Sequence, residues 1–249
     1  MQPFIVIRDH REDDELKCQE LVRDYVMSFA TKSFYCFCFR EITLQFIVIT
    51  WALLFIFLGV PLIFCALTIP GCIFFLFLGT YSSFYAKAVE HIRLKPSTKS
   101  LVAECYEPFI FRCSPNEASY DIFMEKAPYE NDFLRKFRRK IVATVSVKNH
   151  NAVYNAAFIY RFAIAPLYPH QKIMEPMISL VSKNCVNAGF ATLECTVSEW
   201  QESERDFYDS LGFATRQIYH KQIIGSSLTV MKTQMTYNLR TDDVLQKQN

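Results

Sequence analysis

The most prominent pattern in the chain is an apolar run over residues 42–86, which contains no Asp, Glu, Lys, Arg or His across 45 positions. An α-helix needs about 20 apolar residues to cross the roughly 30 Å hydrocarbon core of a bilayer. The breakers Gly59-Val60-Pro61 and Pro70-Gly71 lie inside the run, and either could turn the chain back because proline lacks an amide and glycine relaxes the backbone. We therefore predict a transmembrane helical hairpin over 42–86.

A buried core helix and a signal peptide both fit this run less well. The core helix of a soluble protein does not need such a length, and a cleaved signal peptide has a shorter apolar region without the preceding stretch R-D-H-R-E-D-D-E. Basic residues flank the run on both sides, namely Lys32, Arg40, Lys87, His91, Arg93 and Lys95. Positive charge at both ends favours a hairpin whose ends stay in the cytosol, and we expect it in the endoplasmic reticulum membrane.

Outside this run, strand-like and helix-like patterns alternate. Strand composition marks 4–8, 120–124, 141–147, 156–165, 191–197, 218–224 and 228–239, and helical periodicity marks 13–25, 172–188 and 202–211. Gly189 follows the second helix at the position where helices commonly end in a left-handed residue. The order predicts an α/β (α+β) fold with a mixed central sheet flanked by helices.

Composition narrows the possible functions. A formal charge of +2 over 249 residues gives no basic stripe for nucleic acid, so we expect no nucleic-acid partner. Nine cysteines in an odd set without C-x-x-C or Cys/His ligand spacing indicate reduced thiols and no metal site. Cys36 and Cys38 lie beside the membrane run, as sites of S-acylation or as ordinary interfacial thiols. The basic cluster at 135–140 suits either anionic lipid headgroups or a solvated loop.

The segment F-Y-D-S-L-G-F, residues 207–213, resembles the L/F-Y-x-x-x-G-F signature of GNAT-type N-acetyltransferases. The first strand and helix have the matching I-R-x-x-x-x-x-D pattern from Ile7 to Asp14, and K-I-V-A-T-V-S-V stands as the third strand. A hydrophobic hairpin inserted after the first helix resembles the camello-like, membrane-anchored N-acetyltransferases. Residues 1–30 would supply the first strand and helix, 42–86 the hairpin, 100–240 the remainder of the domain and 241–249 a flexible tail.

The resemblance implies acetyl transfer from acetyl-CoA to an amine, on a small molecule or a protein, at a lipid bilayer. Tyr208 matches the tyrosine that returns a proton to the leaving thiolate. Ile164 and Ala165 end the strand that offers its backbone to the pantetheine arm. The following loop and helix N-terminus, which would hold the pyrophosphate, comprise Pro169, His170, Gln171, Lys172, Ile173 and Met174.

This loop departs from the family pattern R/Q-x-x-G-x-G/A. Pro169, Lys172 and Met174 replace the basic residue, the glycine and the small residue, and Pro176 requires a place in the first helical turn. Two interpretations stay open. Lys172 and His170 could bind phosphate as point charges, giving an active enzyme, or the domain could be a pseudoenzyme that serves as a membrane-tethered binding module.

The candidates for a general base are four acids, Glu194, Glu199, Glu202 and Glu204, whereas Arg161 on the fourth strand cannot serve as one. A hairpin protein that only shapes the membrane would not need a folded domain split around the hairpin. The sequence specifies neither the acceptor nor the oligomeric state.

Overall fold

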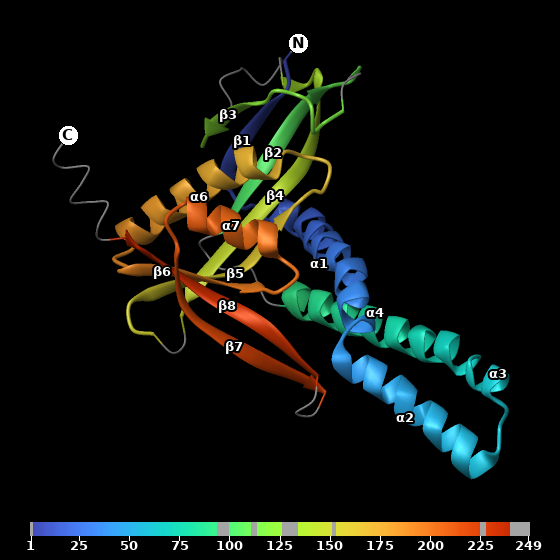
Figure 1. The fold of residues 1–249 in the computed structure, drawn as a ribbon. Coiled ribbons are helices and arrows are strands. Elements are labelled where there is room, and N and C mark those ends of the chain that lie inside the picture. The colour runs from blue at the N-terminus through green and yellow to red at the C-terminus, as the bar shows by residue number, and fades with distance from the viewer. Residues whose placement is uncertain are drawn as a thin grey trace.

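The structure is a computed structural model that describes residues 2–93, 100–110, 114–125, 134–150, 153–224 and 228–239. The predicted tail 241–249 and Lys95 lie outside these residues. Eight strands form one sheet in the order β3-β1-β2-β4-β5-β6-β8-β7 (Figure 1). They are β1 Phe4–Asp9, β2 Ser100–Pro108, β3 Asp121–Met124, β4 Phe137–Asn149, β5 Ala156–Ile164, β6 Thr192–Ser198, β7 Ala214–Ile224 and β8 Leu228–Asn238. The β1–β3 and β5–β6 pairs are parallel and the others antiparallel, which confirms the predicted mixed sheet.

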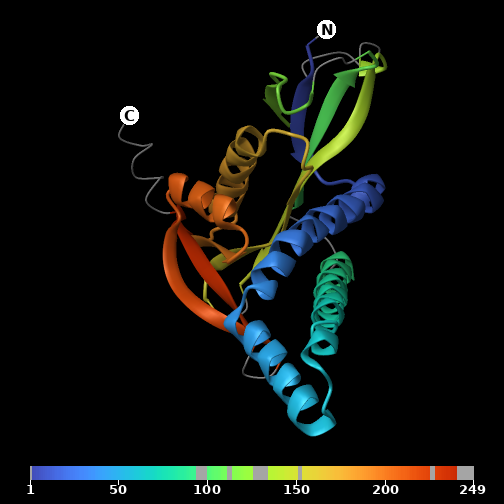
Figure 2. The ribbon, with the colours of Figure 1, turned by 45° about the vertical axis from the view of Figure 1, so that its right-hand side comes forward.

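Helices cover both faces of this sheet. α1 (Glu15–Cys38) and α4 (Thr68–Arg93) lie on one side, and α6 (His170–Asn187) and α7 (Glu202–Ser210) lie on the other (Figure 2). The buried residues of α6 recur at helical spacing, because one face packs on the sheet and the other meets solvent: Ile173, Met174, Met177, Ile178, Val181 and Cys185. Gly189 follows α6 with φ +82°, which confirms the predicted left-handed end.

The I-R-x-x-x-x-x-D pattern has a structural cause. Arg8 on β1 donates to both carboxylate oxygens of Asp14, at 2.6 and 3.0 Å, just before α1 begins. Arg8 also donates to Glu104 in the middle of β2, at 3.0 Å. The sequence pattern did not predict β2 because acids are unusual in a buried strand. Pairing with Arg8 is what makes Glu104 acceptable there.

The apolar run forms two helices and a short connection. α2 (Glu41–Leu58) ends at Gly59, whose φ of +62° is left-handed, and Pro61 precedes the short α3 (Leu62–Cys65). The chain therefore turns at the first predicted breaker. Pro70, in the second breaker, lies in the first turn of α4, where a proline breaks no helical hydrogen bond.

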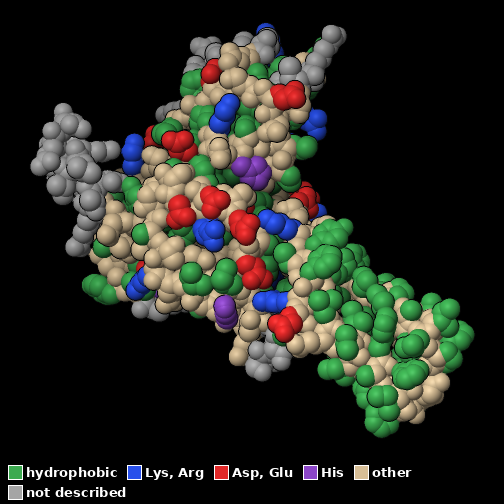
Figure 3. All heavy atoms as spheres, viewed as in Figure 1, with side chains coloured by type: hydrophobic (Ala, Val, Ile, Leu, Met, Phe, Trp, Pro, Cys, Tyr) green, Lys and Arg blue, Asp and Glu red, His purple; other side chains and the backbone are tan. Residues whose placement is uncertain are grey.

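The two helices are long and apolar enough to cross a membrane by length and composition. At most 6% of the apolar window in either segment is buried, and Figure 3 shows their side chains as a mostly hydrophobic surface projecting from the sheet domain. α4 does not stay in this projection. Its later residues Thr80, Phe84 and Ala88 recur every fourth position and are buried against the domain.

A buried arginine donates a hydrogen bond to the C-terminal end of α4. Arg161 on β5 is 2% exposed, and its Nη2 donates to the carbonyl oxygen of His91 at 2.6 Å. Its Nη1 lies 3.7 Å from Oε1 of Glu15, at the start of α1. The last carbonyls of a helix lack partners within the helix and carry partial negative charge, so a guanidinium there stabilises the helix end. Arg161 thus links β5, α1 and α4.

We expect Arg161→Met to lower the free energy of unfolding by about 3 kcal/mol, because it removes the buried partner of the His91 carbonyl and one of the partners of Glu15. Arg205→Met is the matched control, since among the described residues Arg205 forms only an exposed pair with Asp206 at 3.7 Å; its loss should be about 0.5 kcal/mol or less. Denaturation of the purified variants measures both. Equal losses would contradict the linking role of Arg161.

Candidate functional site

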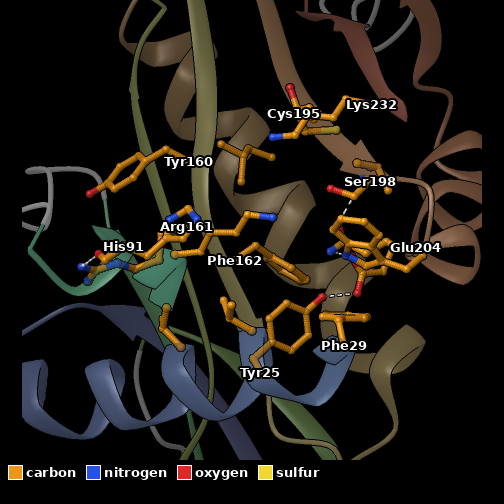
Figure 4. A pocket seen from close by; sticks show the side chains of 18 of the residues that line it. Tyr25, Phe29, His91, Tyr160, Arg161, Phe162, Cys195, Ser198, Glu204 and Lys232 are labelled. Atoms are coloured by element: carbon orange, nitrogen blue, oxygen red, sulfur yellow. Dashed lines mark hydrogen bonds between the residues drawn. The ribbon is translucent and has the colours of Figure 1, made fainter. Parts of the chain in front are cut away.

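A cavity of about 310 Å³ opens where β5 and β6 separate. The two strands pair only over 156–158 and 192–194, although β5 continues to Ile164 and β6 to Ser198. Within the described residues, the facing edges beyond this ladder are therefore not paired with each other. Side chains from α1, α4 and α7 complete the walls (Figure 4).

Glu204 on α7 is the carboxylate of this cavity. Figure 4 shows Tyr25 of α1 and Glu204 pointing toward each other, and the Tyr25 hydroxyl donates to the carboxylate. The Gln201 side-chain amide donates to its other oxygen at 2.6 Å. Burial raises the pKa of Glu204 to about 7, although both hydrogen bonds favour the ionised form. A carboxyl group with this pKa can accept a proton near neutral pH.

Tyr208 lies one helical turn after Glu204 and also lines the cavity. Its side chain is 4% exposed, and its ring packs edge-on against Phe213 at 5.1 Å between centroids. Burial, followed by the nearby Cys195 and Glu204, raises the pKa of Tyr208 well above its ordinary value. The phenol therefore holds its proton at neutral pH. The pair places a proton acceptor and a proton donor on one face of α7.

The rest of the F-Y-D-S-L-G-F segment shapes the end of α7. Gly212 has φ +88°, and a Cβ at this position would meet the Tyr237 ring at 3.5 Å. The amide of Phe213 donates to the carbonyl of Tyr208 at 3.0 Å, which closes the helix end. Phe207 and Phe213 are buried. The segment therefore fixes Tyr208 by backbone closure and packing.

The predicted cofactor residues lie at and beyond the C-terminal end of β5 and line no part of the cavity. Ile164 and Ala165 are buried, and the Ala165 amide is engaged by the Val142 carbonyl on β4 at 2.8 Å. Ile173 and Met174 are core residues at 0% and 2% exposure. His170 is half-buried, with burial lowering its pKa, while Gln171 and Lys172 are exposed. The predicted set is thus split between the core and the surface.

The first turn of α6 offers backbone donors despite the missing glycines. His170, Gln171 and Lys172 are its first three residues, whose amides have no partner within a helix, and the turn contains no acid. Pro169 at the N-cap has no amide to add. Outside glycine, positive φ occurs in the described residues only at Glu125 and Asn155. The loop between β5 and α6 therefore needs no glycine for its own backbone.

Tyr168 anchors this loop, and the sequence patterns did not indicate it. Its hydroxyl donates to Glu107 at the end of β2, at 2.9 Å, and the Tyr120 hydroxyl donates to the same oxygen at 3.2 Å. Tyr168 is 2% exposed, and burial raises its pKa. The loop is thereby fixed to the sheet.

One expectation about α6 is wrong. Pro176 lies in the second turn, not the first. It has no amide to donate to the carbonyl of Lys172, so the helix lacks one hydrogen bond close to its N-terminus.

The remaining acids separate clearly. Glu194 is 1% exposed and is compensated by Arg216 at 2.5 Å and Gln234 at 2.6 Å, whereas Glu202 is exposed. Glu204 is the acid that lines the cavity. Its spacing of four residues from Tyr208 did not enter the sequence prediction, although it could have distinguished Glu204 from the other three acids. Within the described residues, no group of three or more His, Cys, Asp or Glu side chains could hold a metal ion.

Comparison with known proteins supports the acetyltransferase resemblance. The model of the acetyltransferase (GNAT) family matches residues 96–213, a range that includes β2 through α7. This match supports a GNAT-superfamily domain, for which acetyl-CoA is the typical cofactor. No curated protein sequence matches the chain.

Solved structures of low identity also align. The ribosomal-protein-S18-alanine N-acetyltransferase of Escherichia coli has 14% identity over 62% of this chain and 76% of its own, with a TM-score of 0.38. A probable acetyltransferase of Staphylococcus epidermidis has 10% identity over 95% and 99%, with a TM-score of 0.45. A Salmonella typhimurium protein with its cofactor acetyl-CoA has 11% identity over 40% and 59%, with a TM-score of 0.35.

The raised pKa of Glu204 gives stability a specific pH dependence. Between the ordinary value of 4.5 and about 7, the unfolded chain ionises Glu204 while the folded protein keeps it protonated, so the folded state loses relative stability as pH rises. Glu204→Gln cannot ionise. We therefore expect its free energy of unfolding to rise relative to that of wild type by on the order of 2 to 3 kcal/mol across this pH window.

Denaturation of both proteins from pH 5 to pH 8 measures this gain, which should level off above pH 7. Glu202→Gln is the control, because Glu202 is exposed on the same helix. Parallel curves for wild type and Glu204→Gln would show that Glu204 titrates as an ordinary carboxylate.

Proposed function

We propose that this chain is a membrane-anchored N-acetyltransferase of the GNAT superfamily, transferring acetyl from acetyl-CoA to an amine. The observation that carries the proposal is the placement of Glu204 and Tyr208 in one cavity, at the point where β5 and β6 separate. The raised pKa of Glu204 suits a base near neutral pH, and the raised pKa of Tyr208 keeps its proton in place at neutral pH.

The residues present fit an anionic, extended cofactor. The edge of β5 that has no ladder with β6 in the described residues offers backbone groups, and the amides of His170, Gln171 and Lys172 at the start of α6 offer donors for phosphate. The exposed ammonium of Lys172 adds a positive charge at the same place. When bound, acetyl-CoA supplies an acetyl group activated as a thioester.

The protein's own groups handle the protons. Glu204, ionised above about pH 7, accepts a proton from the acceptor ammonium and leaves the amine free to attack. Tyr208 keeps its proton at neutral pH and donates it to the departing sulfur. With acetyl-CoA bound, one N–C bond would form as one C–S bond breaks. The nitrogen would give its second proton to the Tyr208 phenolate and Glu204 would release its proton to solvent, which leaves a neutral amide and a neutral thiol.

A second candidate is a pseudoenzyme that binds a ligand or partner without turnover. Pro169 favours it, because this residue removes an amide at the N-cap where the family pattern has a basic residue. The two candidates differ in whether acetyl-CoA binds and whether its acetyl group is transferred.

We expect the purified full chain to bind acetyl-CoA in calorimetry and to acetylate primary amines, with kcat rising with pH through about 7. Glu204→Gln should lower kcat by a factor of about 10² to 10⁴ without changing acetyl-CoA affinity, because the base acts on the acceptor. Glu202→Gln should behave as wild type. Lys172→Glu should weaken acetyl-CoA binding and leave the pH dependence of kcat unchanged.

Each outcome separates the candidates. No binding at millimolar acetyl-CoA would exclude the transferase. Binding without transfer in wild type would support the pseudoenzyme. Transfer that Glu204→Gln leaves unchanged would remove Glu204 from the mechanism.

The hairpin is proposed to anchor the domain in the endoplasmic reticulum membrane, as in the camello-like N-acetyltransferases. Support comes from the exposed apolar side chains of α2 and of the first half of α4. β1 precedes the insertion and β2 follows it, yet the two strands pair, with Phe4 opposite Tyr106. Both ends of the hairpin must therefore lie on one side of the bilayer, and the flanking basic residues favour the cytosolic side.

We expect a glycosylation acceptor sequence placed at either terminus to stay unmodified when the chain is expressed in cells, since both termini would face the cytosol. The same acceptor sequence placed in the turn after α2, at Gly59, should lie on the luminal side. When a flexible spacer holds it away from the membrane, it should be glycosylated. Modification at a terminus would contradict the cytosolic assignment.

A further inference from the structure

Two ammonium groups line the cavity that contains Glu204. Lys87 comes from α4 and Lys232 from β8, and both are half-buried. The exposed Lys221 on β7 lies diagonally across the ladder from Lys232, whose direct partner is Tyr219. Two positive charges therefore line the cavity, and the third, on Lys221, acts on both of them from outside the lining.

Lys87 is held in an aromatic corner. Its Nζ lies 4.9 Å from the ring centroid of Phe84 and 5.1 Å from that of Trp200. Both rings belong to the packed junction between α4 and the domain. The aromatic faces stabilise the cation but fix it away from bulk water, facing the cavity.

These charges lack a compensating carboxylate. In the described part of the chain, neither Lys87 nor Lys232 forms an ion pair, and the acid that acts on both at longer range is the exposed Glu90. Lys232 and Lys221 each repel Lys87. Burial and Lys221 lower the pKa of Lys232. Like charges held together in a partly buried site favour binding of an anion.

We propose that Lys87 and Lys232 bind an anionic group of the acceptor, so that the acceptor is a small amine that also carries a carboxylate or a phosphate. This inference rests on the proposed function, in which the amine of the same molecule meets Glu204. The cavity of about 310 Å³ suits a small molecule. Phe29, Phe162 and Trp200 on its walls accommodate an apolar or aromatic substituent.

The probes are phenylalanine and phenylalaninamide, two primary amines that differ in the carboxylate. Calorimetry with the detergent-solubilised full chain, with and without coenzyme A, should show phenylalanine binding at least about tenfold more tightly, because its carboxylate meets two ammonium groups. Lys87→Met and Lys232→Met should each weaken phenylalanine about tenfold and leave phenylalaninamide unchanged. Lys183→Met, an exposed site on α6, is the control.

Several results would overturn the assignment. They are equal affinities of the two probes, no binding of phenylalanine at millimolar concentration, or a preference that survives both lysine substitutions. A variant that weakens both probes alike, with a lowered melting temperature, would indicate a packing role. If the substitutions change only binding to nanodiscs that contain phosphatidate, the lysines face lipid phosphate and the acceptor assignment falls.

Failure here is distinguishable from failure of the proposed function. An absence of acetyl transfer to any amine, together with a lysine-dependent preference for phenylalanine, would remove the enzymatic activity and keep the anion site. Transfer to both probes at equal kcat/KM, unchanged in the lysine variants, would keep the activity and remove the anion site.

Discussion

The contact of Arg161 with the end of α4 is the constraint on which the arrangement of the domain depends. A hairpin inserted between β1 and β2 must leave the sheet after α1 and return to it before β2. The returning end of α4 is held by Arg161, which donates to the His91 carbonyl at 2.6 Å. The same guanidinium lies 3.7 Å from Glu15, the first residue of α1. A buried guanidinium is costly unless it has such partners, so the three elements are held together by one charge.

This arrangement makes the end of α4 part of the cavity wall. Because α4 is held against the domain, its last turns place Lys87 and His91 on the cavity wall. The same packing brings Phe84 to Trp200, with centroids 5.4 Å apart, and Trp200 lies in the short connection between β6 and α7. Gln201, the next residue, donates to Glu204. Phe84 of α4 is therefore connected to the carboxylate through two successive residues, Trp200 and Gln201.

The sequence indicated the elements whose signal is local. The apolar run, the Gly59 turn, the helix end at Gly189 and the F-Y-D-S-L-G-F segment each depend on residues that are neighbours along the chain. β2 was missed because Glu104 is tolerated only through Arg8, which lies far away in sequence. The environment of Glu204 was likewise beyond local patterns, since Tyr25, its hydroxyl partner, is 179 positions distant. The four candidate acids were not distinguished from the sequence. In the fold, Glu194 is paired with Arg216, whereas Glu204 lines the cavity.

The loop without glycines illustrates the limit of a motif comparison. Glycine in such a loop serves two separate needs, backbone freedom and room beside the phosphate. Here the first need is absent, because the loop before α6 contains no positive φ and is fixed by the bond from Tyr168 to Glu107. Only the second need remains, and it concerns one exposed side chain, Lys172, whose charge is of the sign that phosphate attracts. The departure from the pattern therefore bears on the strength of cofactor binding, while the pairing of Glu204 with Tyr208 on α7 does not depend on it.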